Sequence, residues 1–160
     1  MRERNLRVLE FPKIREMLKT YAQTESGKAF LDALAPSGEY DTVAAYQEQT
    51  EEANTIISMT GGNPVQYFAD VRPQLKIAAA GGTLSMRALL DVADALRAAR
   101  AARTALVSDR EDTPLLTEMG SRLATNRSLE EEIYNAILSE DEIADRASPE
   151  LYDIRRHIRT

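Results

Sequence analysis

Apolar residues recur at helical spacing along most of this chain, and the longest uninterrupted pattern covers residues 85–107. No Gly or Pro lies inside it. Ser85 suits the N-cap because its hydroxyl can accept a hydrogen bond from a free N–H of the first turn. At 1.5 Å per residue this helix would be about 34 Å long, the width of a small domain. The apolar face is formed by Met86, Leu89, Leu90, Ala93, Leu96, Ala99 and Leu106.

Two shorter helices are predicted before residue 36. Pro12 suits the first position of a helix. The spacing after it predicts a single buried stripe, formed by Ile14, Met17, Leu18 and Tyr21. Thr24 is placed to cap a second helix, which ends before Pro36.

The middle of the chain holds another long helical pattern, which begins after Asp41 and ends in the loop sequence 60–64. Pro73 opens the next helix. Gly81-Gly82 ends it, since Gly readily adopts the left-handed conformation that follows a helix.

After residue 107 the pattern predicts three more helices. Thr113 is the expected N-cap of the first, with Pro114 after it. Ser128 and Glu131 match a capping box for the second. Residues 139–146 are acidic and irregular, and Ser148 begins the last helix. Strand signals are weak throughout, so we expect an all-α, multi-helix bundle.

The last helix reaches Thr160 at full periodicity without a Gly or Pro to end it. We therefore expect the chain to be a piece of a longer protein.

The composition of the chain argues against several classes of function, including thiol chemistry and membrane binding. The chain has 160 residues, enough for one domain with a real core. A net charge of −6 argues against overall electrostatic attraction to nucleic acid. The absence of Cys excludes thiol chemistry and fits a reducing cytoplasm. We see no transmembrane run and no signal peptide, so no membrane partner is expected.

Three stretches resemble the N-terminal region of the bacterial MutS-two family, the endonuclease-type paralogues of the mismatch-repair ATPase MutS. The first runs from Leu9-Glu10-Phe11 through Ser26-Gly27-Lys28 to Leu34-Ala35-Pro36. The second contains Asp70-Val71-Arg72-Pro73, Ala80-Gly81-Gly82 and Leu84-Ser85. The third is Ala147-Ser148-Pro149-Glu150-Leu151 followed by Ile154-Arg155-Arg156. Together they cover essentially the whole chain in register.

The resemblance implies a helical core domain over residues 1–147 and the start of a lever helix over residues 148–160. It also implies a homodimeric parent that binds branched DNA, hydrolyses ATP with Mg²⁺ in a later domain, and carries a C-terminal Smr nuclease domain. Such relatives act in suppression of recombination or in rescue of collided ribosomes. This sequence lacks the phosphate-binding loop Gly-x-x-x-x-Gly-Lys-Ser/Thr, because Ala22 stands before Gly27-Lys28 and Ala29 follows. No catalytic, cofactor-binding or metal-binding residue is therefore assigned.

Candidate nucleic-acid contacts are two rows of arginines. Arg is suited to phosphate binding because its guanidinium presents a planar fork of donors. An ion-paired, exposed helix face is the alternative, and Asp94 is spaced to pair with the first row. The rows consist of Arg97, Arg100 and Arg103, and of Arg155, Arg156 and Arg159.

Two other features have plain structural interpretations. His157 is the only histidine, and we expect it on a helix surface. The acidic clusters 130–132 and 140–142 lack the spacing of a calcium loop, so we expect solvated acidic faces.

Three functional hypotheses follow. The first is a non-catalytic scaffold segment of a MutS-two-type protein. The second is a stand-alone module that binds nucleic acid through the arginines. The third is a helical scaffold that docks a partner protein through an exposed apolar groove.

Overall fold

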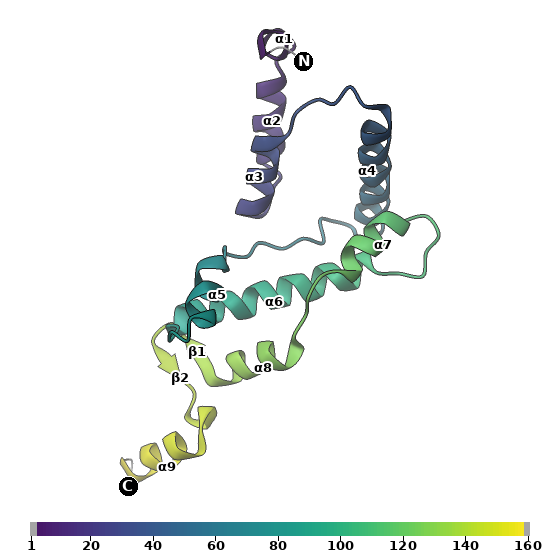
Figure 1. Cartoon of the computed structure of the whole chain (residues 1–160). Helices are drawn as coiled ribbons and strands as arrows, with labels where there is room; N and C mark the ends of the chain where they lie inside the picture. The colour runs from purple at the N-terminus through teal and green to yellow at the C-terminus, as the bar shows by residue number, and fades with distance from the viewer. Residues whose placement is uncertain (1–2, 159–160) are drawn as a thin grey trace. The chain divides into compact units, whose positions relative to one another are not determined.

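The computed structural model describes residues 3–158. Within that range the chain forms nine α-helices, one two-stranded sheet and one 3₁₀ turn (Figure 1). The predicted all-α class is confirmed. The elements are α1 (Glu3–Val8), α2 (Phe11–Lys19), α3 (Glu25–Ala33), α4 (Tyr40–Thr60), α5 (Arg72–Ala79), α6 (Met86–Leu106), α7 (Pro114–Ser121), α8 (Arg127–Ala136), β1 (Ile137–Ser139), β2 (Glu142–Ile143), η1 (Asp145–Ala147) and α9 (Pro149–Ile158).

The chain divides into two compact units. Unit 1 holds the described residues up to Tyr67 together with Ala101–Arg122. Unit 2 holds Phe68–Arg100 together with the described residues from Leu123 onward. The chain passes from unit 2 to unit 1 within α6.

In unit 1, α2 and α3 lie against each other as a helical hairpin. Lys19 Nζ lies 2.7 Å from Asp32 Oδ1, and Arg15 Nη1 donates to the Asp32 carbonyl oxygen at 2.9 Å. Thr24 Oγ1 accepts from the Gly27 amide at 3.1 Å, so the predicted cap of α3 is confirmed. The hairpin is thus held by caps and by polar contacts near its surface.

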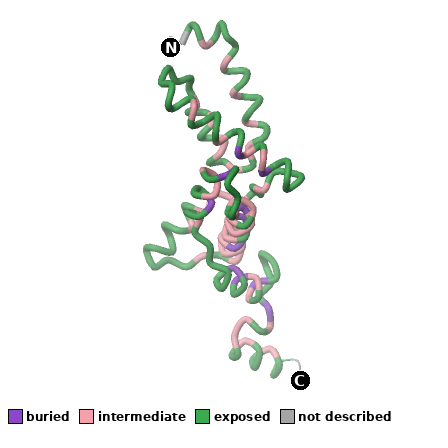
Figure 2. The backbone as a smooth tube through the Cα atoms, turned by 90° about the vertical axis from the view of Figure 1, so that its right-hand side faces the viewer, coloured by how far each residue is buried: buried purple, intermediate pink, exposed green. Residues whose placement is uncertain are grey.

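The predicted buried stripe on α2 is wrong. Ile14, Met17, Leu18 and Tyr21 are all exposed, and Tyr21 reaches 74% exposure. Figure 2 likewise shows mostly exposed positions near the N-terminus. Helical periodicity identifies which face is apolar, but a face is buried only where another element covers it.

Helix α7 packs on α4 within unit 1. Gly120 of α7 lies where an added Cβ would meet the Leu106 Cβ at 2.7 Å, so this close approach requires glycine. Thr117 Oγ1 donates to the Leu106 carbonyl oxygen at 3.0 Å across the same contact. The small Gly120 and the Thr117 hydroxyl therefore hold α7 against the C-terminal end of α6.

In unit 2, the hydrophobic core lies between α6, α8 and β1. Ala93 is fully buried and packs with Ile133 of α8 and Ile137 of β1, and the predicted apolar positions Leu89 and Leu90 pack against them. The predicted cap of α6 is confirmed, since Ser85 Oγ accepts from the Ala88 amide at 3.2 Å.

The predicted start of α8 needs correction. The N-cap of α8 is Asn126, whose Oδ1 accepts from the Leu129 amide at 3.1 Å. Ser128 lies in the first turn and donates to Glu132, while Glu131 pairs with Arg127 instead of closing a capping box. Asn and Ser are both strong caps, so composition alone did not separate the two start points.

Residues 137–143, which include part of the segment predicted to be irregular, form a small antiparallel hairpin. β1 pairs with β2 through Ile137 opposite Ile143 and Ser139 opposite Glu142, with an irregular register between them. Helix α9 then begins as predicted, with Ser148 Oγ accepting from the Leu151 amide at 3.1 Å. Among residues 3–158, no helix combines the length and the apolar character needed to cross a membrane.

Candidate functional site

The arginine row on α6 lies beside carboxylates of the same chain. Arg97 Nη2 lies 2.9 Å from Asp94 Oδ1, an ion pair that the three-residue spacing of Asp94 and Arg97 on one helix predicted. The Arg97 guanidinium also lies 5.7 Å from the ring centre of Tyr134, within the range of a cation–π contact. Arg103 follows on α6 and is half-buried. Whether this row contacts nucleic acid stays a prediction.

Arg100 makes a bidentate ion pair. Its Nε and Nη2 donate to the two carboxylate oxygens of Glu130 at 2.9 and 2.7 Å, a bidentate arrangement between α6 and α8. The Glu130 side chain is only 7% exposed, whereas that of Arg100 is 41% exposed. The hydrogen bonds from Arg100 lower the pKa of Glu130 below its usual range. The carboxylate therefore stays charged although it is buried.

Glu130 was missed by the sequence interpretation, which placed it in a solvated acidic face together with Glu131 and Glu132. A signal was available. Glu130, Ile133 and Ile137 follow one another at spacings of three and four, the pattern of one helix face, and this pattern runs along α8 to the first residue of β1. That face packs on α6, and Glu130 is buried with it.

A second polar contact joins α8 to α6. Tyr134 Oη donates to Asp94 Oδ1 at 2.5 Å. Burial, together with the negative Asp94, raises the pKa of Tyr134 to about 12, so the phenol remains a donor at neutral pH. Two polar groups thus lie between α6 and α8, the pair Arg100–Glu130 and the group of Asp94, Arg97 and Tyr134, and we call them together the α6–α8 network.

The second arginine row lies on α9. Arg155 Nη1 donates to the Ile143 carbonyl oxygen at 2.8 Å and to Asp145 Oδ1 at 2.5 Å, which ties α9 to the hairpin and to η1. Arg156 is exposed on α9. Arg159 lies outside the described residues. His157 is exposed as expected, and its Nδ1 lies 2.7 Å from the Asp153 carbonyl oxygen of its own helix.

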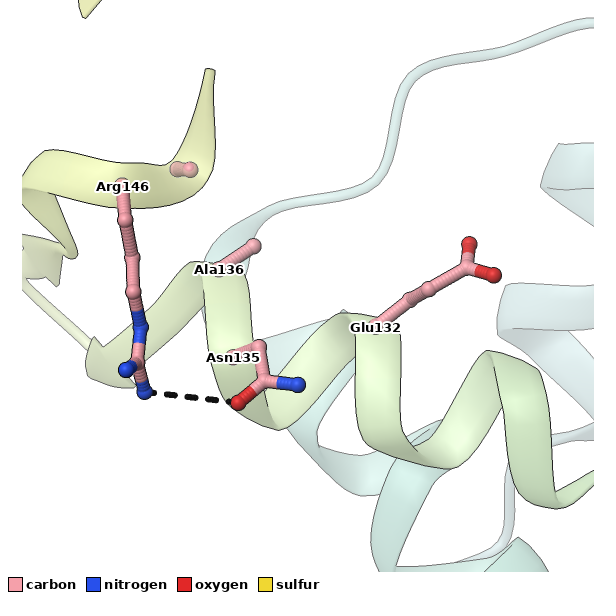
Figure 3. A pocket seen from close by; sticks show the side chains of 5 residues that line it. Glu132, Asn135, Ala136 and Arg146 are labelled. Atoms are coloured by element: carbon pink, nitrogen blue, oxygen red, sulfur yellow. Dashed lines mark hydrogen bonds between the residues drawn. The ribbon is translucent and has the colours of Figure 1, made fainter. Parts of the chain in front are cut away.

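A polar surface hollow of about 550 Å³ lies between α8 and η1. Figure 3 shows that Glu132, Asn135 and Arg146 line it, with Arg146 Nη2 donating to Asn135 Oδ1 at 3.3 Å. Residues 3–158 hold no group of three His, Cys, Asp or Glu side chains placed to bind a metal ion. Nothing in the hollow resembles a nucleophile beside a base.

Unit 1 contains a second buried carboxylate, Glu52 of α4. Its Oε1 and Oε2 accept from the backbone amides of Leu115 and Leu116 at 3.1 and 2.8 Å. A carboxylate at a helix N-terminus satisfies free N–H groups and complements the helix dipole. Thr113 occupies the predicted N-cap position of α7, but its hydroxyl makes no capping hydrogen bond. The amides of Leu115 and Leu116, which an N-cap hydroxyl would bind, donate to Glu52 instead.

No family model matches the chain. It is 38% identical over 161 residues to "Endonuclease MutS2" of Clostridioides difficile (strain 630), an alignment that covers 99% of the chain and 20% of that relative. It is 40% identical over 163 residues to the protein of the same name from Clostridium botulinum (strain Alaska E43 / Type E3), again over 99% of the chain and 20% of the relative.

These alignments cover the chain almost completely but only a small part of each relative. The chain spans about one-fifth of the length of the curated relatives it matches. Identities of 35–40% across nearly all of its residues go well beyond a shared helical composition. The chain is therefore related to a region of the endonuclease MutS2 proteins.

Proposed function

We propose that this chain is a non-catalytic scaffold segment from the N-terminal core of a longer MutS2-type protein. In this proposal residues 1–147 form the helical core, and the residues from Ser148 onward begin the lever that leads to the DNA clamp. The observation that carries the proposal is the alignment of 99% of the chain with MutS2 proteins. The order of the three resembling sequence blocks supports an N-terminal position for the segment in that parent.

The internal contacts of unit 2 suit a segment that transmits motion and carries out no chemistry. The α6–α8 network ties two helices through a bidentate ion pair and a tyrosine–aspartate bond, and Arg155 ties α9 to the preceding hairpin. Elements held in this way move as a body when a neighbouring domain changes its conformation. ATP and Mg²⁺ would be bound by a later domain of the parent.

The parent would be a cytoplasmic homodimer that acts on branched DNA, to suppress recombination, or on collided ribosomes. A C-terminal nuclease domain would carry out cleavage. None of these activities is assigned to the residues of this chain.

The experiment compares the purified 160-residue chain with the full-length protein encoded by its native reading frame. We expect the chain alone to show no turnover of ATP with Mg²⁺ and no cleavage of a four-way DNA junction. We expect the full-length protein to hydrolyse ATP. Turnover by the chain alone, above that of a buffer control, would contradict the scaffold proposal. So would a reading frame without a phosphate-binding loop.

Nucleic-acid binding by the arginines is tested separately. Changing Arg155, Arg156 and Arg159 together to Gln is expected to weaken binding of the full-length protein to a four-way junction. It should also reduce the salt dependence of that binding, because a protein that makes fewer phosphate contacts releases fewer counterions from the DNA. Arg122→Gln/Arg127→Gln is the control, because these two exposed arginines lie outside α9 and each pairs with a glutamate four residues away in the sequence. Equal losses in the two variants would contradict a specific role for the α9 arginines.

A further inference from the structure

The N-terminal end of α7 is capped from a distant part of unit 1 and not by its own N-cap residue. The first residue of the helix is a proline, which has no N–H group, and the Thr117 amide donates to the Thr113 carbonyl oxygen at 3.0 Å. The free donors of the first turn are therefore the amides of Leu115 and Leu116. Both donate to Glu52 of α4, at 3.1 and 2.8 Å.

Thr113 stands at the N-cap position, yet its hydroxyl is unused. The residue is fully buried, and its Oγ1 has no hydrogen-bond partner among the described residues. An N-cap threonine ordinarily accepts a hydrogen bond from the second or third amide of its helix. Those are the two amides that donate to Glu52. A buried hydroxyl without a partner lowers stability, so Thr113 is not explained by the packed state alone.

The backbone at Thr113 also differs from that of a threonine that does cap. Thr24, in the same unit, has a φ of −125° and a ψ of +153°, and its Oγ1 accepts from the Gly27 amide. Thr113 has a similar φ of −138° but a ψ of only +46°. Rotation about this one ψ angle would give Thr113 the capping conformation and would change the direction in which α7 leaves the preceding loop. Thr113 is thus placed to act both as a second cap and as a hinge.

The rest of α7 is attached to a different helix. Gly120 lies where an added Cβ would be 2.7 Å from the Leu106 Cβ, and Thr117 Oγ1 donates to the Leu106 carbonyl oxygen at 3.0 Å. These contacts join α7 to α6, whereas Glu52 joins its N-terminal end to α4 (Figure 1). A helix of eight residues is marginal alone in water, so the packing on α6 keeps α7 helical when its contact with α4 opens.

We propose that α7 is a latch on α4 with two alternative caps. In the latched state Glu52 caps α7 and holds its N-terminal end on α4. In the released state this end leaves α4, and the Thr113 hydroxyl accepts from one of the two free amides while water solvates the other. Because one cap replaces another, the two states stay close in free energy, and a small change at α4 or α7 shifts their populations. This device is separate from the scaffold function and needs neither ATP nor nucleic acid.

The experiment measures hydrogen exchange of the Leu115 and Leu116 amides in the wild-type 160-residue chain and in Thr113→Val. Valine keeps the shape of threonine but cannot cap, so it destabilises the released state and removes the unsatisfied hydroxyl from the latched state. We expect the faster-exchanging of the two amides to gain protection about tenfold, from about fivefold for the lost cap and about twofold for the removed hydroxyl. The amides of α8 lie outside the latch and should gain no more than about twofold.

A double-variant cycle tests the same exchange of caps independently. Thr113→Val is expected to raise the equilibrium constant for folding about twofold in the wild type but to lower it about fivefold in Glu52→Ala, where the hydroxyl is the only cap left. Thr113→Ser keeps the hydroxyl and should have the same effect in both backgrounds. Thr117→Val removes a hydroxyl of the same helix that does not cap, so its effect should also be independent of Glu52. Urea denaturation measures all four constants of each cycle.

Several results would overturn the proposal. One is a protection gain at Leu115 and Leu116 no larger than that of α8, which would mean that α7 is not released before the chain unfolds. Another is an effect of Thr113→Val that is the same in the wild type and in Glu52→Ala.

Glu48→Ala, at an exposed glutamate of α4, is the control background, and a reversal of sign there would remove the specific role of Glu52. Circular dichroism establishes that the variants are folded. If Glu52→Ala prevents folding, the exchange measurement on Thr113→Val decides by itself.

Discussion

Among the residues whose burial the structure describes, each unit contains one buried glutamate, and the two are stabilised in different ways. Glu52 in unit 1 and Glu130 in unit 2 are both 5% exposed. Glu52 accepts two hydrogen bonds from the backbone at the start of α7. Glu130 accepts two from the guanidinium of Arg100. Two donors satisfy each of these buried carboxylates, and those of Glu52 carry no charge.

The difference matters for how each unit responds to substitution. The donors of Glu52 belong to the main chain, so a side-chain change at Leu115 or Leu116 leaves them in place. The donors of Glu130 belong to a single side chain and can be removed. Unit 2 thus depends on a specific pair of residues, whereas unit 1 depends on the position of a helix end relative to one carboxylate.

The largest effect is expected from Arg100→Ala, because it leaves Glu130 buried without its donors. We expect a loss of about 3 kcal/mol in the free energy of unfolding, measured by urea denaturation. Arg97→Ala, which removes a more exposed ion pair, should cost less than about 1 kcal/mol. The double variant Arg100→Met/Glu130→Leu should recover most of the loss, since neither charge is then stranded. A double variant as unstable as Arg100→Ala would mean that the packing of Arg100, not the pairing of charges, is what matters.

Glu52→Ala is expected to cost about 1.5 kcal/mol, the upper range for loss of a helix N-terminal cap. Hydrogen exchange should show the Leu115 and Leu116 amides losing protection while the amides of α8 remain unchanged. Glu48→Ala, which changes an exposed glutamate of the same helix, is expected to alter stability by less than about 0.5 kcal/mol. Similar losses in the two variants would show that the contact with α7 contributes little.

The pH dependence of stability provides a separate test of the Arg100–Glu130 pair. Because the pKa of Glu130 is lower in the folded protein than in the unfolded chain, its contribution is complete above the unfolded value near 4.5. That contribution is lost as the pH falls through the folded value. Glu130→Gln should therefore reduce stability by about 1 kcal/mol at pH 7 and by progressively less below pH 4.5.

Urea denaturation of the wild type and Glu130→Gln between pH 7 and pH 3 measures this difference. Arg72 also lowers the pKa of Asp70, to about 2, so the wild type loses stability in acid from more than one group. The difference between the two proteins isolates the contribution of Glu130. A difference that does not change with pH would rule out its titration as the cause.

The smallest effect is expected at Thr113, which is fully buried and whose hydroxyl has no hydrogen-bond partner among the described residues. Thr113→Val removes an unsatisfied polar group at nearly constant shape and should stabilise the protein by about 0.5 kcal/mol. Thr117→Val removes a hydroxyl that does donate, to the Leu106 carbonyl, and should cost about 1 kcal/mol. Thermal unfolding of both variants checks the opposite signs, and destabilisation by Thr113→Val would point to a partner for its hydroxyl.

Local chemistry made most of the helices predictable. The caps at Thr24, Ser85 and Ser148 were predicted from residue type and are present in the structure. The stop after α5 was predicted as well, and Gly81 has a φ of +78°. Each of these helix ends depends on residues within one helical turn of each other, so it can be predicted from the local sequence alone. The similarity to MutS2 proteins was likewise visible in the order of the sequence blocks.

Contacts between distant residues were decided only by the tertiary structure. The pairs Glu52–Leu115 and Arg100–Glu130 are 63 and 30 residues apart, and helical periodicity does not state which helix lies opposite a given face. The same limit explains the exposed apolar face of α2, whose pattern indicated burial. The sequence by itself determined where the helices form and which faces are apolar. Tertiary packing decided which faces are covered and which carboxylates are buried, because both depend on the neighbour that each face meets.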